Sequence, residues 1–322
     1  MHELTIRKNG KAEMAYVGAT PWHGLGQQLP EGAELDVWRE AAGMDWRIGR
    51  SRVRYGDAPS QYIFDDHHVL FRSDTKQPLG IVSPKYQVVQ PGQVLEFFND
   101  LTKANGFKLH TAGTLFGGKR FWALASIGEE ATIVGQDRVG GFLLLSSSCD
   151  GSLATTARFT TICVVCNNTL SMAINGKKAE VTIRHTSKFD PKAVKDQLGI
   201  VTGRFGEFMS AARSLAKVPL TNNQAGQLVG DLLLETKTVL GTIKDVSQSK
   251  QYQKIMELFK GNAMGGTLLG REGTAWGAVN AVTEFVDHHA RAQSDSNRLA
   301  SAWFGRGDAL KTAAMDKALL LV

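Results

Sequence analysis

Three arginines alternate with other residues in the segment WRIGRSRVRY, and an aromatic residue stands at each end: Arg50, Arg52, Arg54, Trp46 and Tyr55. In a β-strand, every second side chain points to the same face, so the guanidinium groups would form one row. Two strand steps span about 6–7 Å, which is close to the phosphate spacing along one nucleic-acid strand. The pattern predicts phosphate contacts by the arginines and base stacking by the two rings. The alternative is an edge strand whose charges prevent pairing with other strands.

A second basic pair, Lys119 and Arg120, ends the segment GTLFGGKR. This segment nearly matches the phosphate-binding pattern G-x-x-x-x-G-K-[ST]. However, Arg120 replaces the hydroxyl that would bind magnesium, and the next residues, FWALASI, are typical of a strand rather than of a helix that could hold phosphate. We therefore predict a β-hairpin in which Lys119 and Arg120 contact phosphates and Trp122 stacks on a base. Further candidates on β-rich segments are Lys108, His110, Phe121, Arg158 and Arg184.

Cysteine and histidine groups suggest two other kinds of site. The segment CVVC resembles a redox or zinc pair, but Cys163 and Cys166 would face opposite sides of a strand, so we expect buried structural thiols. Asp-His-His, a string found in one class of metal phosphoesterases, occurs in FDDHHVLF and FVDHHARA. In the second copy, Asp287 stands beside Glu284 and His288, which would share a helix face. A metal-dependent nucleotide or DNA hydrolase is thus the main enzyme alternative, although we identify no catalytic constellation and predict no cofactor.

The composition is that of an ordinary globular protein, with 322 residues of which 43% are hydrophobic and 21% charged. The net charge of +6 is consistent with a nucleic-acid partner. We expect no membrane span, because no apolar run reaches about 18 residues. The first residues lack the apolar region of a secretory signal, and three cysteines indicate a reducing compartment. These features predict a cytoplasmic protein.

Strand-like and helix-like segments divide the chain near residue 188. Residues 1–188 are rich in strand-forming residues, and GQVLEFFNDLTKANG has the spacing of a helix. Beyond residue 189, Asp190 is a candidate N-cap, Pro191 suits the first helical position, and helical spacing continues to the C-terminus. We predict an α+β fold: a mainly antiparallel sheet body at 1–188 with a helix in the N-terminal half, and a helical region at 189–322 packed on that body.

Four segments carry a resemblance to a known family: TPWHGLG, SSSCDGSLATTARFTTICVVCNNTL, GTAWGAVNAVTEFVDHHAR and SAWFGRGDALK. Together they are similar to an uncharacterised phage/plasmid-like family, domain of unknown function 932. In that family a histidine usually precedes the central Asp-Gly-Ser, here Asp150 to Ser152, whereas this chain has Cys149. The resemblance implies an origin in a phage or plasmid and supplies no reaction. We interpret WHGLG, residues 22–26, as a structural turn.

The expected order of elements is similar to that of phage single-strand annealing proteins, which oligomerise and hold single-stranded DNA in a positively charged groove. We therefore expect a phage- or plasmid-encoded protein that binds single-stranded nucleic acid in replication or recombination and forms homo-oligomers. A further alternative is a counter-defence protein that acts by binding another protein. Such a protein would show a large exposed apolar patch and no basic groove.

Overall fold

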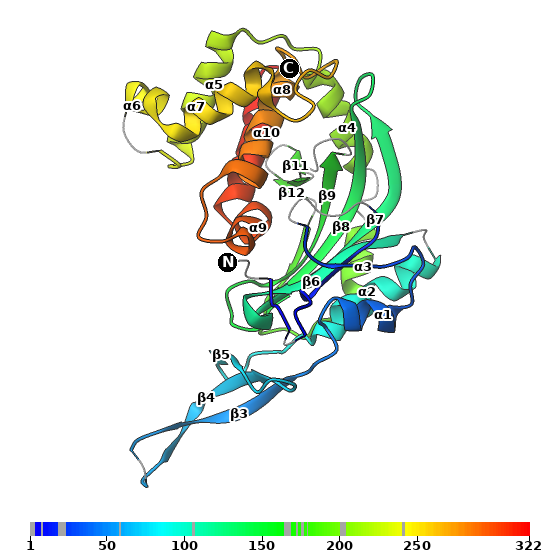
Figure 1. Cartoon of the computed structure of the whole chain (residues 1–322), viewed down its shortest axis with the longest axis vertical. Helices are drawn as coiled ribbons and strands as arrows, with labels where there is room; N and C mark the ends of the chain where they lie inside the picture. The colour runs from blue at the N-terminus through cyan, green and yellow to red at the C-terminus, as the bar shows by residue number, and fades with distance from the viewer. Residues whose placement is uncertain are drawn as a thin grey trace. The chain divides into compact units, whose positions relative to one another are not determined.

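The computed structural model describes residues 4–7, 9–18, 24–57, 59–104, 107–163, 169–171, 173–174, 177–178, 180–199, 204–239 and 242–322. Most strands precede the long run of helices along the chain, so the α+β class and the helical C-terminal region are confirmed (Figure 1). In the described part of the chain, no helix is both long enough and apolar enough to cross a bilayer.

Strands and helices have the following bounds. The strands are β1 Met14–Tyr16, β2 Gln27–Gln28, β3 Ile48–Tyr55, β4 Tyr62–Arg72, β5 Pro78–Val82, β6 Lys108–Leu115, β7 Arg120–Thr132, β8 Arg138–Ser148, β9 Thr155–Cys163, β10 Thr169–Ser171, β11 Ala173–Ile174, β12 Lys177–Lys178 and β13 Glu180–Ile183. The helices are α1 Leu35–Ala41, α2 Pro91–Ala104, α3 Pro191–Gly199, α4 Arg204–Leu215, α5 Asn222–Glu235, α6 Ile243–Gln248, α7 Lys250–Glu257, α8 Ala275–Glu284, α9 Asp295–Phe304 and α10 Arg306–Leu319. Shorter helical turns are η1 Phe116–Gly118, η2 Leu258–Asn262 and η3 Phe285–His289.

The largest sheet has the strand order β10-β9-β8-β7-β6-β1-β2, and β13 also pairs with β9. Its pairs with a determined register are antiparallel except for β1 with β2, which are parallel. This arrangement confirms the predicted, mainly antiparallel sheet, and α2 is the helix expected in the N-terminal half. A separate sheet has the order β3-β4-β5, which makes β3 an edge strand.

Two compact units make up the chain. Unit 1 consists of Met1–Gly128, Leu143–Arg158 and Glu180–Ile200, and unit 2 consists of Glu129–Phe142, Phe159–Ala179 and Val201–Val322. The boundary predicted at 188/189 separates segments by secondary-structure type, and it stays a prediction.

Helix starts in the C-terminal region follow from local capping. The Asp190 carboxylate accepts hydrogen bonds from the backbone amides of Lys192 at 2.9 Å and Ala193 at 3.2 Å, so the predicted N-cap of α3 is confirmed. Thr221 and Gln224 form a reciprocal capping box at α5. In unit 2, every residue of α8 is buried, and this helix is therefore the centre of the unit 2 core.

The predicted hairpin of GTLFGGKR is formed by β6 and β7, with Leu115 paired to Arg120 across the turn η1. All three residues of η1 have a positive φ: 56° at Phe116, 71° at Gly117 and 93° at Gly118. A Cβ on Gly118 would lie 2.6 Å from the Trp46 ring, whereas a Cβ on Gly117 would meet nothing within 4 Å. The turn therefore requires glycine at residue 118 for space as well as for backbone conformation.

Replacing Gly118 with alanine is expected to lower the free energy of unfolding by about 2 kcal/mol, because strain at positive φ and a steric clash add together. Gly117→Ala is the matched control, since it introduces the strain without the clash, at about 1 kcal/mol. Urea unfolding followed by tryptophan fluorescence measures both. Equal losses would show that the contact with Trp46 does not constrain the turn.

Candidate nucleic-acid interface

The β3–β4 hairpin carries exposed cations on its edge strand, and Figure 1 shows it extending away from α1 and α2. Arg50, Arg52 and Arg54 are all exposed. Arg50 donates from Nη2 to the carbonyl oxygen of Tyr86 at 2.8 Å. Among the described residues, no carboxylate forms an ion pair with Arg52 or Arg54. The two outer arginines therefore remain available to an anionic ligand.

The pairing of β3 with β4 sets the direction of the arginine row. Arg50 pairs with Leu70 and Arg52 with His68, so these two arginines share one face in a regular ladder. Arg52 pairs with His68, whereas the next residue, Val53, pairs with Phe64. The register therefore shifts between Arg52 and Val53, and residues 65–67 of β4 are passed over. Bulges of this kind bend a strand and increase its twist. The regular part of the row thus ends at Arg52.

Exposed aromatic rings lie at the outer part of the same hairpin. Tyr55 is 58% exposed and Tyr62, its partner across the hairpin, is 60% exposed, with the ring centroids 5.7 Å apart. Phe64 is also exposed, and its ring stacks on His67 at 5.2 Å. Tyr62 and Phe64 were not predicted as site residues. Their place opposite the β3 segment becomes evident only once the register is known.

The two tryptophans predicted to stack on bases are core residues instead. Trp46 is 4% exposed, donates from Nε1 to the Gly43 carbonyl at 2.7 Å, and lies under the Arg72 guanidinium at 4.2 Å. Trp122 is 1% exposed and covers Gly113, where a Cβ would lie 2.7 Å from the indole ring. Neither ring presents a free face, so their role in this structure is packing rather than stacking on a ligand.

Lys119 and Arg120 lie beside the Asp-Gly-Ser loop that follows β8. The Lys119 carbonyl accepts from the backbone amide of Cys149 at 2.9 Å. Arg120 donates from Nε to the Ser152 hydroxyl at 3.1 Å, and its guanidinium lies 5.3 Å from the Phe116 ring centroid. The Ser152 hydroxyl in turn donates to Asp150 at 2.5 Å. Both basic residues are only partly exposed, and Arg120 is held by the loop.

Tyr86 connects Arg50 to this loop. Its carbonyl accepts from Arg50, and its hydroxyl donates to the Ser148 carbonyl at 2.9 Å. The Tyr86 ring stacks on His185 with centroids 4.4 Å apart. The structure therefore brings Arg50 into one contact network with the strand end that precedes Cys149, while Arg52 and Arg54 lie farther along β3. The basic residues form an extended series along unit 1 rather than one compact cluster.

Cys149 precedes the Asp-Gly-Ser loop, and its thiol is buried. Burial and the neighbouring Asp150 raise the pKa of this thiol to about 12. The sulfur lies 3.4 Å from the carbonyl oxygens of Gly118 and Lys119. A protonated, enclosed thiol is a poor nucleophile, and the contacts of Cys149 hold the hairpin turn against the loop.

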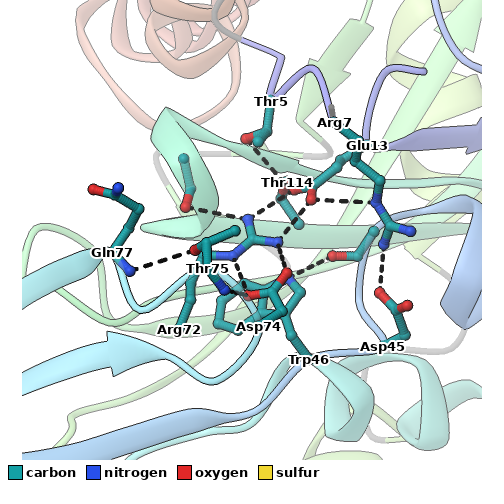
Figure 2. Close-up of polar contacts among 12 residues, drawn as sticks. Thr5, Arg7, Glu13, Asp45, Trp46, Arg72, Asp74, Thr75, Gln77 and Thr114 are labelled. Atoms are coloured by element: carbon teal, nitrogen blue, oxygen red, sulfur yellow. Dashed lines mark hydrogen bonds and ion pairs between the residues drawn. The ribbon is translucent and has the colours of Figure 1, made fainter. Parts of the chain in front are cut away.

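Arg72 anchors the inner end of the β3–β4–β5 sheet, as Figure 2 shows. Its buried guanidinium donates to both oxygens of Glu13, at 3.0 and 2.7 Å, and to Asp74 at 3.0 and 2.8 Å. Thr114 adds a hydrogen bond to Glu13 at 2.5 Å. Burial would lower the pKa of Arg72, but the hydrogen bonds to Glu13 and Asp74 outweigh it and raise the pKa. Desolvation would raise the pKa of Asp74, but the hydrogen bonds from Arg72 and from the Thr75 amide outweigh it and lower the pKa.

The remaining candidates differ in their exposure and partners. Lys108 pairs with Glu31 at 3.7 Å, and Arg158 is buried 3.3 Å from Glu180. Phe121 is buried, Arg184 is exposed, and burial lowers the pKa of His110. Two predictions lie outside the described residues: Cys166 with the side chain of Cys163, and residues 22–23 of WHGLG.

In unit 2, the Asp-His-His aspartate belongs to a buried ion pair. Asp287 accepts from Lys311 at 2.7 Å and from the backbone amide of Thr169 at 2.7 Å. Glu284 accepts from the Met264 amide at 2.9 Å. No group of three or more His, Cys, Asp or Glu residues in the described ranges could hold a metal ion. The structure thus joins three segments that carry the family resemblance, through Thr169, Asp287 and Lys311, in a structural contact.

Comparison with known proteins gives one family match. Residues 78–303, more than half of the chain, match the family described as a domain of unknown function (DUF932). Neither a curated protein nor a solved structure matches the chain. The matched residues include Lys119, Arg120 and the Asp-Gly-Ser loop, whereas β3 and β4 precede them. The chain belongs to the DUF932 family.

Proposed function

We propose that this protein binds single-stranded nucleic acid along the β3–β4 hairpin, as a phage- or plasmid-encoded component of replication or recombination. Arg52 and Arg54 contact phosphates, and the rings of Tyr55 and Tyr62 stack on bases. Arg50 with Lys119 and Arg120 extends the basic path toward the Asp-Gly-Ser loop. Binding of this kind requires no covalent chemistry.

The observation that carries the proposal is that Arg52 and Arg54, which form no ion pair with a described residue, lie on the same hairpin as exposed aromatic rings. Tyr55 and Tyr62 are more than half exposed, with centroids 5.7 Å apart, next to Arg54. Proteins that bind single strands without sequence preference combine cationic side chains with aromatic faces. Because β3 is an edge strand, protection of that edge by charge is the competing explanation. It accounts for the arginines but gives no reason for the exposed tyrosines.

A titration of labelled oligothymidylate, followed by fluorescence anisotropy at several salt concentrations, tests the phosphate contacts. The wild-type affinity should fall steeply with salt, and Arg52→Gln/Arg54→Gln should reduce the slope of log K against log salt by about 1.4, since each single-strand phosphate contact contributes about 0.7. Lys188→Gln/Lys192→Gln is the control, because it removes two exposed charges of unit 1 outside the hairpin. Absence of wild-type binding at low salt would leave edge protection as the explanation.

The same titration with Tyr55→Ala/Tyr62→Ala tests stacking. The affinity should fall by about 1–3 kcal/mol for each base that loses a stacking partner, while the salt slope should stay unchanged because no phosphate contact is removed. Ile81→Ala, which removes an exposed apolar side chain from β5 of the same sheet, is the control. A loss equal to that of Ile81→Ala would contradict stacking.

Homo-oligomer formation is part of the proposal, because a single hairpin covers only a short length of strand. Sedimentation with and without oligothymidylate tests it, and assembly should increase when nucleic acid is present. In unit 2, Asp287 pairs with Lys311 and Glu284 accepts a hydrogen bond from the Met264 amide, so these residues do not favour a metal-dependent hydrolase.

A further inference from the structure

Unit 2 contains a cavity of about 440 Å³ with a cationic wall. Four basic residues line it: Lys237, Arg291, Arg298 and Arg306. Among the described lining residues, none is acidic. Three of them, Lys237, Arg291 and Arg306, are exposed at the cavity and form no ion pair with any described residue. Such an excess of positive charge among the described lining residues attracts an anion.

The remaining wall combines apolar surface with a helix start. Phe285 and Leu310 line the cavity, and both are buried. The N-terminus of α10 also lies there: Gly305 precedes it without a capping side chain, and the Gly307 amide donates to the Ser301 hydroxyl at 3.2 Å. The partial positive charge of a helix N-terminus adds to that of the basic residues. An anion with an apolar moiety fits both parts of the wall.

Two of the basic residues differ from the others in their backbone surroundings. Arg298 donates from Nε to the Ala290 carbonyl at 3.1 Å. Lys237 adopts a left-handed conformation with φ of 52°, which is unfavourable for a residue with a side chain. A left-handed residue is common directly after the C-cap of a helix, here α5, and the Thr238 amide closes this helix end by donating to the Leu233 carbonyl at 3.0 Å. Glycine would suit this backbone better than lysine, so Lys237 can be replaced by glycine without backbone strain.

We propose that this cavity binds a nucleoside phosphate, with the phosphates against the four basic residues and the base against Phe285 and Leu310. The volume lies within the range of sites for small molecules, about 300–1,000 Å³. The site is formed within unit 2, whereas the proposed nucleic-acid hairpin belongs to unit 1. The two proposals can therefore fail independently.

Isothermal titration of the full chain at low salt, with a panel of four nucleoside diphosphates, pyrophosphate and adenosine, tests the proposal. At least one nucleoside diphosphate should bind more tightly than pyrophosphate, and adenosine should bind least. Arg291→Gln and Arg306→Gln should each weaken binding about tenfold, because each removes a charge-assisted hydrogen bond. Lys260→Gln, an exposed lysine of unit 2 that does not line the cavity, should leave binding unchanged.

Lys237→Gly separates binding from folding. Glycine relieves the positive φ, so the midpoint of thermal unfolding should not fall, while nucleotide affinity should decrease. The hairpin variant Arg52→Gln/Arg54→Gln should bind nucleotide as the wild type does. The proposal is overturned if no nucleoside diphosphate binds, if pyrophosphate binds as tightly as all four, or if the hairpin variant rather than the cavity variants loses binding.

Discussion

Arg72→Met should lower the free energy of unfolding by about 3–5 kcal/mol, because it leaves the buried Glu13 carboxylate without its main counter-ion. Arg72 donates two hydrogen bonds to Glu13 and two to Asp74, and both Arg72 and Glu13 are buried. Trp46, one of six tryptophans in the chain, lies 4.2 Å from the guanidinium, so it contributes a signal from this part of unit 1 during urea unfolding. The loss should therefore appear in the tryptophan signal.

Arg39→Met is the matched control for Arg72→Met. Arg39 also contacts two carboxylates, Asp36 at 3.0 Å and Glu96 at 3.1 Å, but all three side chains are partly or largely exposed. Exposed ion pairs contribute about 0.2–1 kcal/mol, so this variant should be only slightly destabilised. The double variant Arg72→Met/Glu13→Met should be more stable than Arg72→Met, because no unpaired charge remains buried. Equal losses for Arg72→Met and Arg39→Met would contradict the argument.

The pH dependence of the same network follows from Asp74, whose pKa is lowered in the folded protein. A carboxyl group with a lowered folded pKa stabilises the protein above its unfolded pKa, and this contribution is lost as the pH falls through the folded pKa. Wild type should therefore be more stable than Asp74→Asn at neutral pH, and the difference should shrink in acid. A difference that persists unchanged in acid would show that the charge of Asp74 is not responsible.

Local sequence patterns predicted the elements well because they depend on neighbouring residues. The hairpin at GTLFGGKR and the cap at Asp190 are set by turn and capping chemistry within a few positions. The burial of individual aromatic residues could not be predicted from such local patterns. Trp46 and Tyr55 stand at the two ends of the same basic segment, yet Trp46 packs against Arg72 while Tyr55 is exposed. That difference depends on residues 26 positions apart, which the local pattern does not specify.

The candidate site was predicted only in part, because it also depends on contacts between residues that are distant in the sequence. The shared face of Arg50 and Arg52 follows from alternation along a strand, but the shift in register after Arg52 depends on β4. Tyr62 and Phe64 join the site only through that pairing. The Asp-His-His string is a comparable case in unit 2, because spacing alone suggests metal ligands. Its aspartate instead meets Lys311, and hydrogen bonds from Thr169, 118 positions away, complete the contact.

Lys311→Met tests that interpretation, and it should lower the free energy of unfolding by about 3–5 kcal/mol by leaving Asp287 buried without a partner. The Lys311 side chain is 1% exposed and donates to Asp287 at 2.7 Å and to the Thr169 carbonyl at 2.6 Å. Urea unfolding, with hydrogen exchange of α10 peptides to locate the loss in unit 2, measures the effect.

Lys317→Met is the control on the same helix. Lys317 forms an ion pair with Glu235 at 2.6 Å, but that pair is more exposed, so its loss should cost less than about 1 kcal/mol. Asp287→Leu/Lys311→Met should recover part of the stability lost by Lys311→Met, because both charges are removed together. If Asp287 served as a metal ligand rather than as the partner of Lys311, Lys311→Met would resemble Lys317→Met, and added divalent metal would stabilise the wild type but not Asp287→Asn.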